Sequence, residues 1–271
     1  MRLVDAHGHL QHESYAGDRD AVIEAAAGSG VVRLLVPGWD APSSRDALEL
    51  AARYPWVDAA VGTHPHDASS VDDDAWSEVA RLATDERVRA IGETGLDYDR
   101  AYAPREDQLA NLRRNLALAL DVGKPAILHC RSKAGQRDAQ DELLDELRRA
   151  GLGGPAWRTR FGDRPPAVLH SFSGPPDYAA AALDLGLMVS FGGLVFRRGE
   201  EASGEIARMA PDDRLLVETD CPFLSPPGAP RRRNEPRWVE VTARWLAAQR
   251  ADDPDALGER LVANYDRTFG R

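Results

Sequence analysis

The 271-residue sequence is poor in cysteine and in lysine: its only cysteines are Cys130 and Cys221, and its only lysines are Lys124 and Lys133. Two cysteines cannot form a disulfide framework, and by themselves they cannot supply a zinc site made of thiolates. We therefore expect both thiols to be reduced and to act as packing residues. Because lysine is scarce, arginine carries nearly all of the positive charge.

Long hydrophobic runs and an excess of positive charge are also absent. No apolar run approaches the roughly 20 residues that a membrane-spanning helix requires, and Met1 leads into a polar Asp-His segment instead of a signal peptide. The net charge is −10, which repels polyanions at long range. These absences argue against a membrane protein and against a non-specific nucleic-acid coat protein, and we expect a cytoplasmic location.

What is present suffices for one folded domain. The chain is 43% hydrophobic and 29% charged, and its length is close to the roughly 250 residues of an eight-unit α/β barrel. Short apolar runs alternate with amphipathic helical stretches, as expected of βαβ units with a parallel sheet. The predicted strands are Leu3–Ala6, Val31–Val36, Val57–Val61, Val88–Ile91, Ala126–Leu128, Ala167–Leu169, Leu187–Ser190 and Leu215–Val217.

This order of elements favours an α/β fold, a (β/α)8 TIM barrel that spans residues 1–271 as a single domain. An open doubly wound sheet is the alternative, but such sheets usually carry a glycine-rich phosphate-binding turn after the first strand, and Asp5–His9 contains none. Leucines at helical spacing predict a helix over Pro104–Val122, which Gly123 ends. A final helix over Asp255–Phe269 would make a short C-terminal helical extension.

In such a barrel, the groups that carry chemistry gather at the carboxyl ends of the strands. The Gly151–Pro166 segment, rich in glycine, proline and arginine, connects a helix to the next strand, so we expect it to be a surface insertion on the opposite face. Five strand ends, by contrast, carry imidazole or carboxylate groups. After the first, fourth, fifth, sixth and eighth strands come, in order, His7 with His9, Glu93, His129, His170 and Asp220.

Imidazole and carboxylate groups together are the ligand set for zinc, manganese, iron or cobalt. His7 and His9 are two residues apart, so they leave the same face of an extended strand, as two ligands of one ion require. Six ligands are more than one ion needs when it must also hold substrate. Two ions that share a bridging carboxylate explain the set better, and we expect Glu93 to be the bridge.

The simplest partition gives His7, His9 and Asp220 to one ion and His129 and His170 to the other, although spacing alone leaves this open. Two ions about 3.5–4 Å apart hold both the attacking and the leaving oxygen of a displacement at phosphorus. Asp220 needs only one oxygen for its ion, so it is the expected general base for the attacking water, with a purely ligating role as the alternative.

The motifs around these residues resemble those of the TatD-type metal-dependent deoxyribonucleases of the amidohydrolase superfamily. The resemblance runs from Asp5 to Phe269, and the motifs are highly specific when taken together. They are Asp5-Ala6-His7-Gly8-His9-Leu10, Gly62-Thr63-His64-Pro65-His66, Gly92-Glu93-Thr94-Gly95-Leu96-Asp97-Tyr98, Leu128-His129-Cys130-Arg131, His170-Ser171-Phe172-Ser173-Gly174, Glu218-Thr219-Asp220-Cys221-Pro222-Phe223-Leu224, Arg233-Asn234-Glu235-Pro236 and Asn264-Tyr265-Asp266-Arg267-Thr268-Phe269.

The resemblance implies a (β/α)8 barrel in which the six strand-end residues hold two divalent metal ions, Zn²⁺, Mg²⁺ or Mn²⁺. It also implies hydrolysis of DNA phosphodiesters from the 3′ end of single strands, so DNA is the expected partner and the enzyme is expected to be a monomer. No ligand is missing, which argues against an inactive relative. Ser132 and Lys133 stand where the family often has an acid, so the substrate preference is less certain than the chemistry.

Many phosphotriesterase-like members of the superfamily bridge their two metals with a carbamylated lysine. Lys124 lies before its strand and thus on the wrong face of the barrel. Lys133 lies beyond the strand that carries His129 and is within reach, but Glu93 already offers a bridge. We therefore expect a carboxylate-bridged site.

The third strand carries no ligand in this scheme, but His64 and His66 follow it. His66 resembles the substrate-facing position of the family, whereas His64 is equally a packing residue or a partner of phosphate. Arg131 and Asn234 are the other predicted phosphate contacts, Arg131 through a bidentate fork and Asn234 through its amide. Asp5 is predicted to orient a metal-bound histidine from behind.

Charge is distributed unevenly along the predicted rim of the site. His66–Glu86 contains seven acids and one arginine, whereas Pro222–Arg244 contains five arginines and two acids. Arg197 and Arg198 follow the seventh strand. We therefore expect the substrate backbone to enter over the seventh and eighth strands, with helix capping as the alternative role for the acids at positions 72–74.

Three functions are consistent with the sequence. A metal-dependent nuclease or phosphodiesterase leads. A metallohydrolase of a small ester, lactone or amide is the alternative, because the same metal-activated water serves carbonyl chemistry. A non-catalytic nucleic-acid-binding protein is least favoured, because the ligand set is complete. For a nuclease, the net charge of −10 limits the length of DNA that the protein grips.

Overall fold

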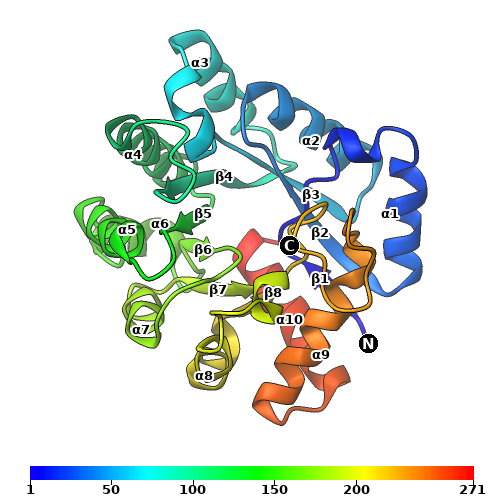
Figure 1. The fold of residues 1–271 in the computed structure, drawn as a ribbon. Helices are drawn as coiled ribbons and strands as arrows, with labels where there is room; N and C mark the ends of the chain where they lie inside the picture. The colour runs from blue at the N-terminus through cyan, green and yellow to red at the C-terminus, as the bar shows by residue number, and fades with distance from the viewer.

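Eight parallel strands form one sheet in the order β1 to β8 in the computed structural model, which describes residues 1–271 (Figure 1). The strands are β1 (Leu3–Asp5), β2 (Val31–Pro37), β3 (Val57–Val61), β4 (Val88–Asp97), β5 (Ala126–Arg131), β6 (Ala167–Leu169), β7 (Met188–Phe191) and β8 (Leu215–Val217). Backbone hydrogen bonds from Ala6 N to Val217 O (3.0 Å) and from Asp220 N to His7 O (2.8 Å) join the first and last strands. The sheet is therefore closed, and the predicted (β/α)8 TIM barrel is confirmed.

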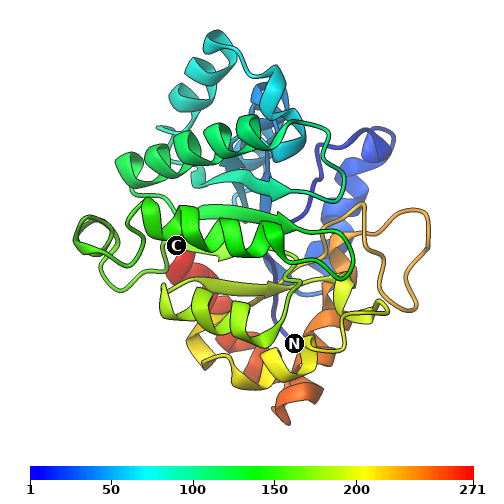
Figure 2. The ribbon, with the colours of Figure 1, turned by 60° about the vertical axis from the view of Figure 1, so that its left-hand side comes forward.

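Helices surround the barrel on its outside (Figures 1 and 2). They are α1 (Arg19–Gly28), α2 (Ala41–Arg53), α3 (Asp73–Leu82), α4 (Arg105–Val122), α5 (Asp138–Arg149), α6 (Pro155–Phe161), α7 (Pro176–Asp184), α8 (Ser203–Met209), α9 (Val239–Arg250) and α10 (Pro254–Phe269). Helix α4 begins one residue later than predicted, because Pro104 is its N-cap, and it ends as predicted at Gly123, whose φ is +69°. None of the helices is long and apolar enough to cross a membrane.

Strands β4 and β5 are longer than their apolar runs predicted, because their pairing continues into polar residues. Gly95 pairs with His129, and Asp97 pairs with Arg131. Only glycine fits at position 95, since its φ is +145° and a Cβ there would lie 1.9 Å from the carbonyl oxygen of His129. This close approach fixes the polar ends of both strands in register at the mouth of the barrel, the end where the βα loops lie.

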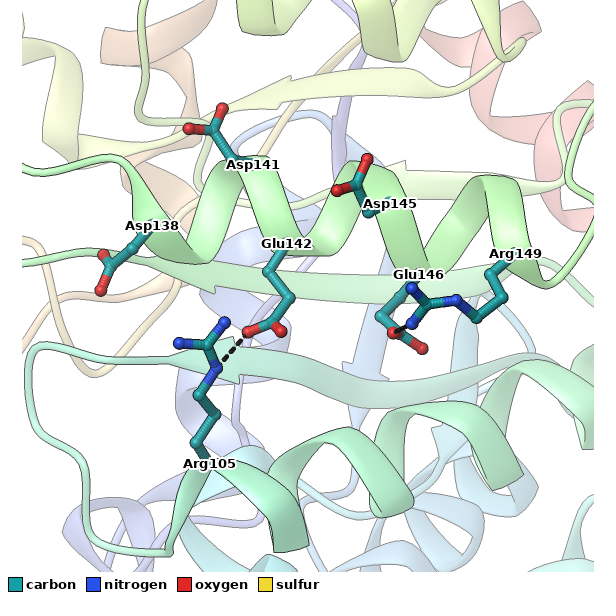
Figure 3. A pocket seen from close by; sticks show the side chains of 7 residues that line it. All are labelled: Arg105, Asp138, Asp141, Glu142, Asp145, Glu146 and Arg149. Atoms are coloured by element: carbon teal, nitrogen blue, oxygen red, sulfur yellow. Dashed lines mark hydrogen bonds and ion pairs between the residues drawn. The ribbon is translucent and has the colours of Figure 1, made fainter.

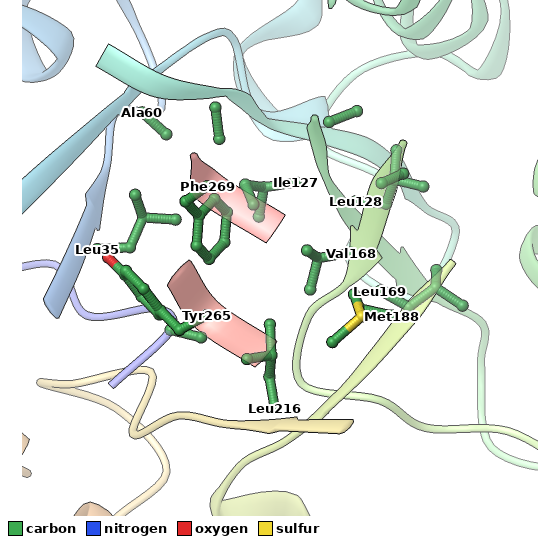
Figure 4. Close-up of a cluster of buried hydrophobic side chains, with 14 of the residues drawn as sticks. Leu35, Ala60, Ile127, Leu128, Val168, Leu169, Met188, Leu216, Tyr265 and Phe269 are labelled. Atoms are coloured by element: carbon green, nitrogen blue, oxygen red, sulfur yellow. The ribbon is translucent and has the colours of Figure 1, made fainter. Parts of the chain in front are cut away.

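The opposite end of the barrel, its bottom, is closed by α10. Tyr265 and Phe269 of this helix lie between the inward-facing apolar side chains of the strands, with Leu35, Ile127 and Leu216 around them (Figure 4). Tyr265 and Phe269 contact each other edge to face, with ring centroids 4.6 Å apart. The predicted C-terminal helical extension is thus present, and it fills the bottom of the barrel.

The Gly151–Pro166 segment lies between α5 and β6 and contains α6. Its two large apolar residues, Trp157 and Phe161, are buried and stack on each other with centroids 5.3 Å apart. Trp157 Nε1 donates to the carbonyl oxygen of Ala150 at 3.0 Å. The segment is therefore packed against the core by its aromatic residues.

Candidate metal centre

The side chains predicted as metal ligands converge at the mouth of the barrel. Their ligand atoms, together with one from His64, fall into three overlapping groups, in each of which all atoms lie within 4.8 Å of one another. The groups are His7, His170 and Asp220; His7, His9 and Glu93; and His64, Glu93 and His129. The residues come from strand ends that are up to 213 positions apart in the chain, so only closure of the barrel brings them together.

His7 and His9 lie just beyond β1, on either side of Gly8. Gly8 pairs in parallel with Cys221, and His9 N donates to Cys221 O at 2.7 Å, which ties both histidines to the end of β8. Their Nε2 atoms are 3.1 Å apart, and His9 Nδ1 faces the carbonyl oxygen of Pro37 at 3.3 Å. The proton of His9 therefore belongs on Nδ1, which leaves Nε2 as a free lone pair beside His7.

Glu93 stands at the centre of the cluster, with 3% of its side chain exposed. Its Oε2 lies 3.2 Å from His7 Nε2 and 3.5 Å from His9 Nε2. Its Oε1 lies 2.9 Å from His170 Nε2 and 3.0 Å from His129 Nδ1. One carboxylate oxygen thus faces each of the two histidine pairs, which is the placement that a bridging carboxylate requires.

Asp220 follows β8 and has a φ of +53°, a conformation that non-glycine residues rarely adopt and that is often found at functional sites. Its Oδ1 lies 3.5 Å from His9 Nε2 and 3.9 Å from His7 Nε2. Its side chain is 15% exposed, so the carboxylate is open to the mouth.

Two buried carboxylates that the sequence analysis did not single out hold the outer nitrogens of the histidines. Glu218 Oε1 lies 3.1 Å from His170 Nδ1, and Asp97 Oδ2 lies 3.2 Å from His129 Nε2. Glu218 also accepts hydrogen bonds from the backbone N–H of Ser171 and the hydroxyl of Ser190. These contacts turn the other nitrogen of each ring toward Glu93, as carboxylates behind metal-ligating histidines do.

His64 is part of the cluster, but its contacts favour a supporting position. Its Nδ1 accepts the backbone N–H of His66 at 3.1 Å, so the ring proton belongs on Nε2, which lies 3.2 Å from Glu93 Oε1. Burial lowers the pKa of His64 to about 4, against the opposing effect of Glu93. A neutral His64 therefore donates to Glu93 and fixes its orientation.

The contacts of Asp5 differ from the prediction that it orients a histidine ring. It contacts no histidine ring; instead it accepts hydrogen bonds from the backbone N–H of Thr219 at 2.9 Å, from the Thr219 hydroxyl at 2.6 Å, and from the backbone N–H of His7. Burial raises the pKa of Asp5 to about 8. The residue thus holds the end of β1 against the end of β8 and acts on the backbone of His7, not on an imidazole.

The contacts of Asn234 differ from the prediction that its amide binds phosphate. Its side chain is fully buried, and its amide donates to the carbonyl oxygen of Thr219 at 3.0 Å while its Oδ1 accepts the backbone N–H of Glu235 at 2.9 Å. Both ends of the amide are therefore used to fold the loop after β8, and neither reaches a substrate. His66 and Arg131 do line the mouth; His66 Nε2 is 2.7 Å from Asp97 Oδ2, and Arg131 pairs with Asp99 at 2.9 Å.

A cavity of about 1180 Å³ opens above the cluster, and we call it the mouth cavity. Loops that follow all eight strands contribute to its wall. Arg100, Lys133 and Arg198 line it, and none of the three has a carboxylate within 4 Å. Because most other arginines of the chain are ion-paired, these three unpaired cations make the cavity suited to an anionic ligand.

Only part of the positive rim predicted from the sequence lines the cavity: Arg198, which follows β7, lies on its wall, whereas the arginines that follow β8 do not. Arg231, Arg232 and Arg233 follow β8 but lie outside the cavity wall. Arg233 is bound to Asp18 and to Glu235 at 2.8 and 2.9 Å. Local pairing therefore neutralises part of this arginine-rich stretch, and the cations that face the cavity follow β4, β5 and β7 instead.

The two cysteines and Lys124 have structural roles, whereas Lys133 faces the mouth cavity. Both cysteines are free; Cys221 is buried, and burial raises the pKa of the Cys130 thiol to about 12. Lys124 donates to the backbone carbonyls of Ala83 and Asp85 at the bottom of the barrel. Lys133 lies on the wall of the mouth cavity, while Glu93 lies between the two histidine pairs.

A second hollow lies between α4 and α5 and contains no histidine (Figure 3). Arg105 pairs with Glu142 at 2.6 Å, and Arg149 pairs with Glu146. Five of the seven residues that line this hollow are acidic and only two are arginines, so it is unsuited to an anionic ligand, in contrast to the mouth cavity.

Comparison with known proteins shows the family and the fold. The sequence model of the family described as TatD related DNase matches residues 4–270. The chain is 36% identical to the 3′-5′ ssDNA/RNA exonuclease TatD of Erwinia billingiae and 33% identical to the uncharacterized metal-dependent hydrolase YabD of Bacillus subtilis, with 98% of both chains covered in each case. The crystal structure of YJJV, a TatD homolog from Escherichia coli, superposes with a TM-score of 0.86 at 27% identity and covers 100% of this chain and 98% of that one.

Proposed function

The chain belongs to the TatD-related DNase family and is a metal-dependent hydrolase, and we propose from this premise that it removes nucleotides from the 3′ end of single-stranded DNA with two divalent ions. The observation that carries the proposal is Glu93, each of whose oxygens faces a separate pair of histidines. The direction and strandedness follow the printed name of the relatives that are about 35% identical.

In the proposed site, Glu93 would be shared by two ions, which would be Zn²⁺, Mg²⁺ or Mn²⁺. His7, His9 and Asp220 would hold one ion, and His129 and His170 would hold the other. The donor set fits this role, because the facing Nε2 atoms of His7 and His9 and the two sides of Glu93 leave lone pairs directed into one small space. When bound, the ions would polarise a phosphoryl oxygen and make a water molecule more acidic.

Asp220 is the proposed general base. Its carboxylate lies beside His9 and His7 and is open to the mouth cavity. It can therefore accept the proton of the water that attacks phosphorus and hold that proton on Oδ1 or Oδ2. Glu218 and Asp97 fix the rings of His170 and His129, so that these histidines need no reorientation during the reaction.

The wall of the mouth cavity would bind the phosphates of the strand. Arg100, Lys133 and Arg198 are free to pair with phosphate oxygens, and Arg131 and His66 are proposed to contact the phosphate nearest the metal centre. Because these cations are few and the net charge of the chain is −10, binding should involve a short stretch of DNA and weaken with salt. All of these groups come from one chain, so a monomer suffices.

The test uses purified protein and oligonucleotides labelled at the 5′ or the 3′ end, single- and double-stranded, with each divalent ion or with chelator. We expect stepwise shortening of 5′-labelled single strands, and complete loss of cleavage with chelator. Asp220→Asn should abolish cleavage, whereas the matched surface variant Asp141→Asn should retain it, since Asp141 pairs with Arg137 on α5.

Two other outcomes would favour the alternative functions. Hydrolysis of lactones or amides by a protein that leaves DNA intact would favour the carbonyl metallohydrolase. DNA binding without turnover, unaffected by chelator and by Asp220→Asn, would favour a non-catalytic binding protein.

A further inference from the structure

Two of the three exposed large hydrophobic side chains of this protein stand on the wall of the mouth cavity. Tyr102 is 67% exposed and Phe223 is 50% exposed. The third, Met209, ends α8 and lies outside the wall. Exposed apolar surface is unfavourable in water, so two exposed aromatic rings on one cavity point to a ligand with apolar faces.

The two rings approach the cavity from opposite sides of the barrel. Tyr102 lies in the loop between β4 and α4, and Phe223 lies in the loop that follows β8. In a closed sheet of eight strands, β4 and β8 are four strands apart in either direction, and Figure 1 shows them across the barrel from each other. The cluster around Glu93 is at the mouth between these loops, so one ring stands on each side of it.

Each ring is held by the groups that build the site. The ring of Tyr102 contacts His66 with centroids 4.7 Å apart, and His66 is bound to Asp97. The centroid of the Phe223 ring lies 5.6 Å from that of His12 and 6.1 Å from that of His9. Both aromatic side chains are therefore positioned relative to the ligands, although much of their surface is open to solvent.

Phosphate-binding groups accompany the rings. Arg100 is two residues before Tyr102 and has no carboxylate partner, so a cation and an aromatic face lie on the same loop. Sites for single-stranded nucleic acids combine these two features, cations along the backbone and aromatic side chains on which bases stack. A double helix presents neither face of its internal bases, so such rings discriminate against it.

We propose that Tyr102 and Phe223 are two base-stacking subsites, one on each side of the metal centre, and that each receives the face of one unpaired nucleobase. The inference rests on the proposed function, since it assigns the bases that flank the phosphate held at the ligands. It identifies these two rings as the residues that select unpaired ends.

The test combines protein variants that lack one aromatic ring with a substrate that lacks the terminal bases. The substrates are a single-stranded oligonucleotide and the same strand with two abasic residues at its 3′ end. For the wild type, the two abasic residues remove both stacks and should raise KM about 100-fold, since one base–aromatic stack contributes about 5- to 160-fold. Tyr102→Ala and Phe223→Ala should each raise KM by about tenfold on the normal strand, with kcat within about twofold, and have much less effect on the abasic strand.

Matched variants complete the experiment. Tyr102→Phe and Phe223→Tyr should keep the KM of the wild type, because they keep the ring, and Met209→Ala should change nothing. A normal KM in both alanine variants, or an equal loss on normal and abasic strands, would overturn the proposal. A change of oligomeric state in the alanine variants would also overturn it, because the rings would then serve a protein contact.

A binding measurement separates this inference from the proposed function. The Asp220→Asn protein, which we expect to be inactive, is mixed with a strand that carries 2-aminopurine at its 3′ end. Stacking should quench the fluorescence, and the quenching should disappear in one of the two variants, Tyr102→Ala or Phe223→Ala, because a single terminal base meets a single ring. If the wild type cleaves no strand and ring-dependent quenching persists, the proposed nuclease activity falls and the base subsites stand. If no quenching occurs, the subsites are refuted whatever the activity.

Discussion

The bottom and the mouth of the barrel both bury a carboxylate, but they neutralise it in different ways. At the bottom, Asp58 accepts hydrogen bonds from the hydroxyl of Tyr265 and the Nε of Arg271, both at 2.9 Å. At the mouth, Glu93 meets only histidines, and no arginine or lysine contacts it. The charge of Asp58 at the bottom is therefore neutralised by its neighbours. The nitrogen and oxygen lone pairs around Glu93 at the mouth lack such partners, and a divalent cation would satisfy them.

The two ends of the barrel thus serve different purposes, stability at the bottom and ligand binding at the mouth. The C-terminal helix α10 fills the bottom and supplies its own partners for the buried polar groups, which serves stability. At the mouth, the loops leave nitrogen and oxygen atoms of the ligands facing one another, which serves binding and catalysis. The predictions below separate these two roles.

The largest effect is expected from Glu93→Gln at the mouth. The amide cannot bridge two cations, and each bound ion contributes several kcal/mol to the transition state, so kcat/KM on single-stranded DNA should fall by about 1000-fold or more. The fold, followed by circular dichroism, should be unchanged. Glu205→Gln on the exposed face of α8 is the matched control and should retain full activity. Activity within tenfold of the wild type would contradict the bridging role of Glu93.

The next effect is expected from Phe269→Ala at the bottom. Removing this buried ring leaves a cavity under the strands, which should lower the free energy of unfolding by about 3–5 kcal/mol in urea titration. The kcat of the protein that remains folded should be unchanged. Phe223→Ala removes the same side chain from the mouth, where it is half exposed, and should leave the unfolding free energy nearly unchanged. Similar losses in both variants would mean that the two ends do not differ as described.

A smaller effect is expected from Glu218→Gln, behind the ligand His170. Loss of the charge beside His170 Nδ1 should weaken metal affinity by about 10- to 100-fold, as measured with a competing chelator dye. Saturating metal should restore most of kcat, since no ligand has been removed. Glu240→Gln, which breaks only an exposed pair with Arg244 on α9, should leave metal affinity unaltered. Unaltered affinity in Glu218→Gln would show that the carboxylate serves only the fold.

The smallest effect is expected from the cations of the mouth cavity. Arg100→Ala, Lys133→Ala and Arg198→Ala should each raise KM a few-fold and reduce the slope of log KM against log salt by about one. Arg232→Ala, outside the cavity wall, should change neither quantity. If instead Arg231→Ala and Arg232→Ala raise KM and the cavity variants do not, the strand enters over the arginine-rich stretch after β8.

The sequence predicts the barrel and the positions of the ligands because both depend on local signals. Apolar runs mark the buried middle of each strand, and the first polar residues beyond these runs are at the mouth, as His129 after Leu128 illustrates. The ends of the strands are less predictable. The extension of β4 to Asp97 depends on pairing with β5, and a polar sequence does not reveal it.

The errors concern contacts that form across the barrel. The sequence predicts Asn234 as a phosphate ligand. The loop after β8 folds back, however, so that the Asn234 amide forms hydrogen bonds with the backbone of Thr219 and Glu235. Asp5 reads as a partner of a histidine, but Thr219 of the last strand end takes its carboxylate. Glu218 is visible in its motif, yet only the position of His170, 48 residues away in the chain, shows what it holds. Such roles depend on three-dimensional neighbours and not on spacing.

The proposed site requires two ions, one on each side of Glu93. Crystals grown with Mn²⁺ and measured at the manganese absorption edge test this without an assay. We predict two anomalous peaks, one beside Oε2 with His7, His9 and Asp220, and one beside Oε1 with His129 and His170. A single peak, or peaks that do not contact Glu93, would contradict the two-ion site.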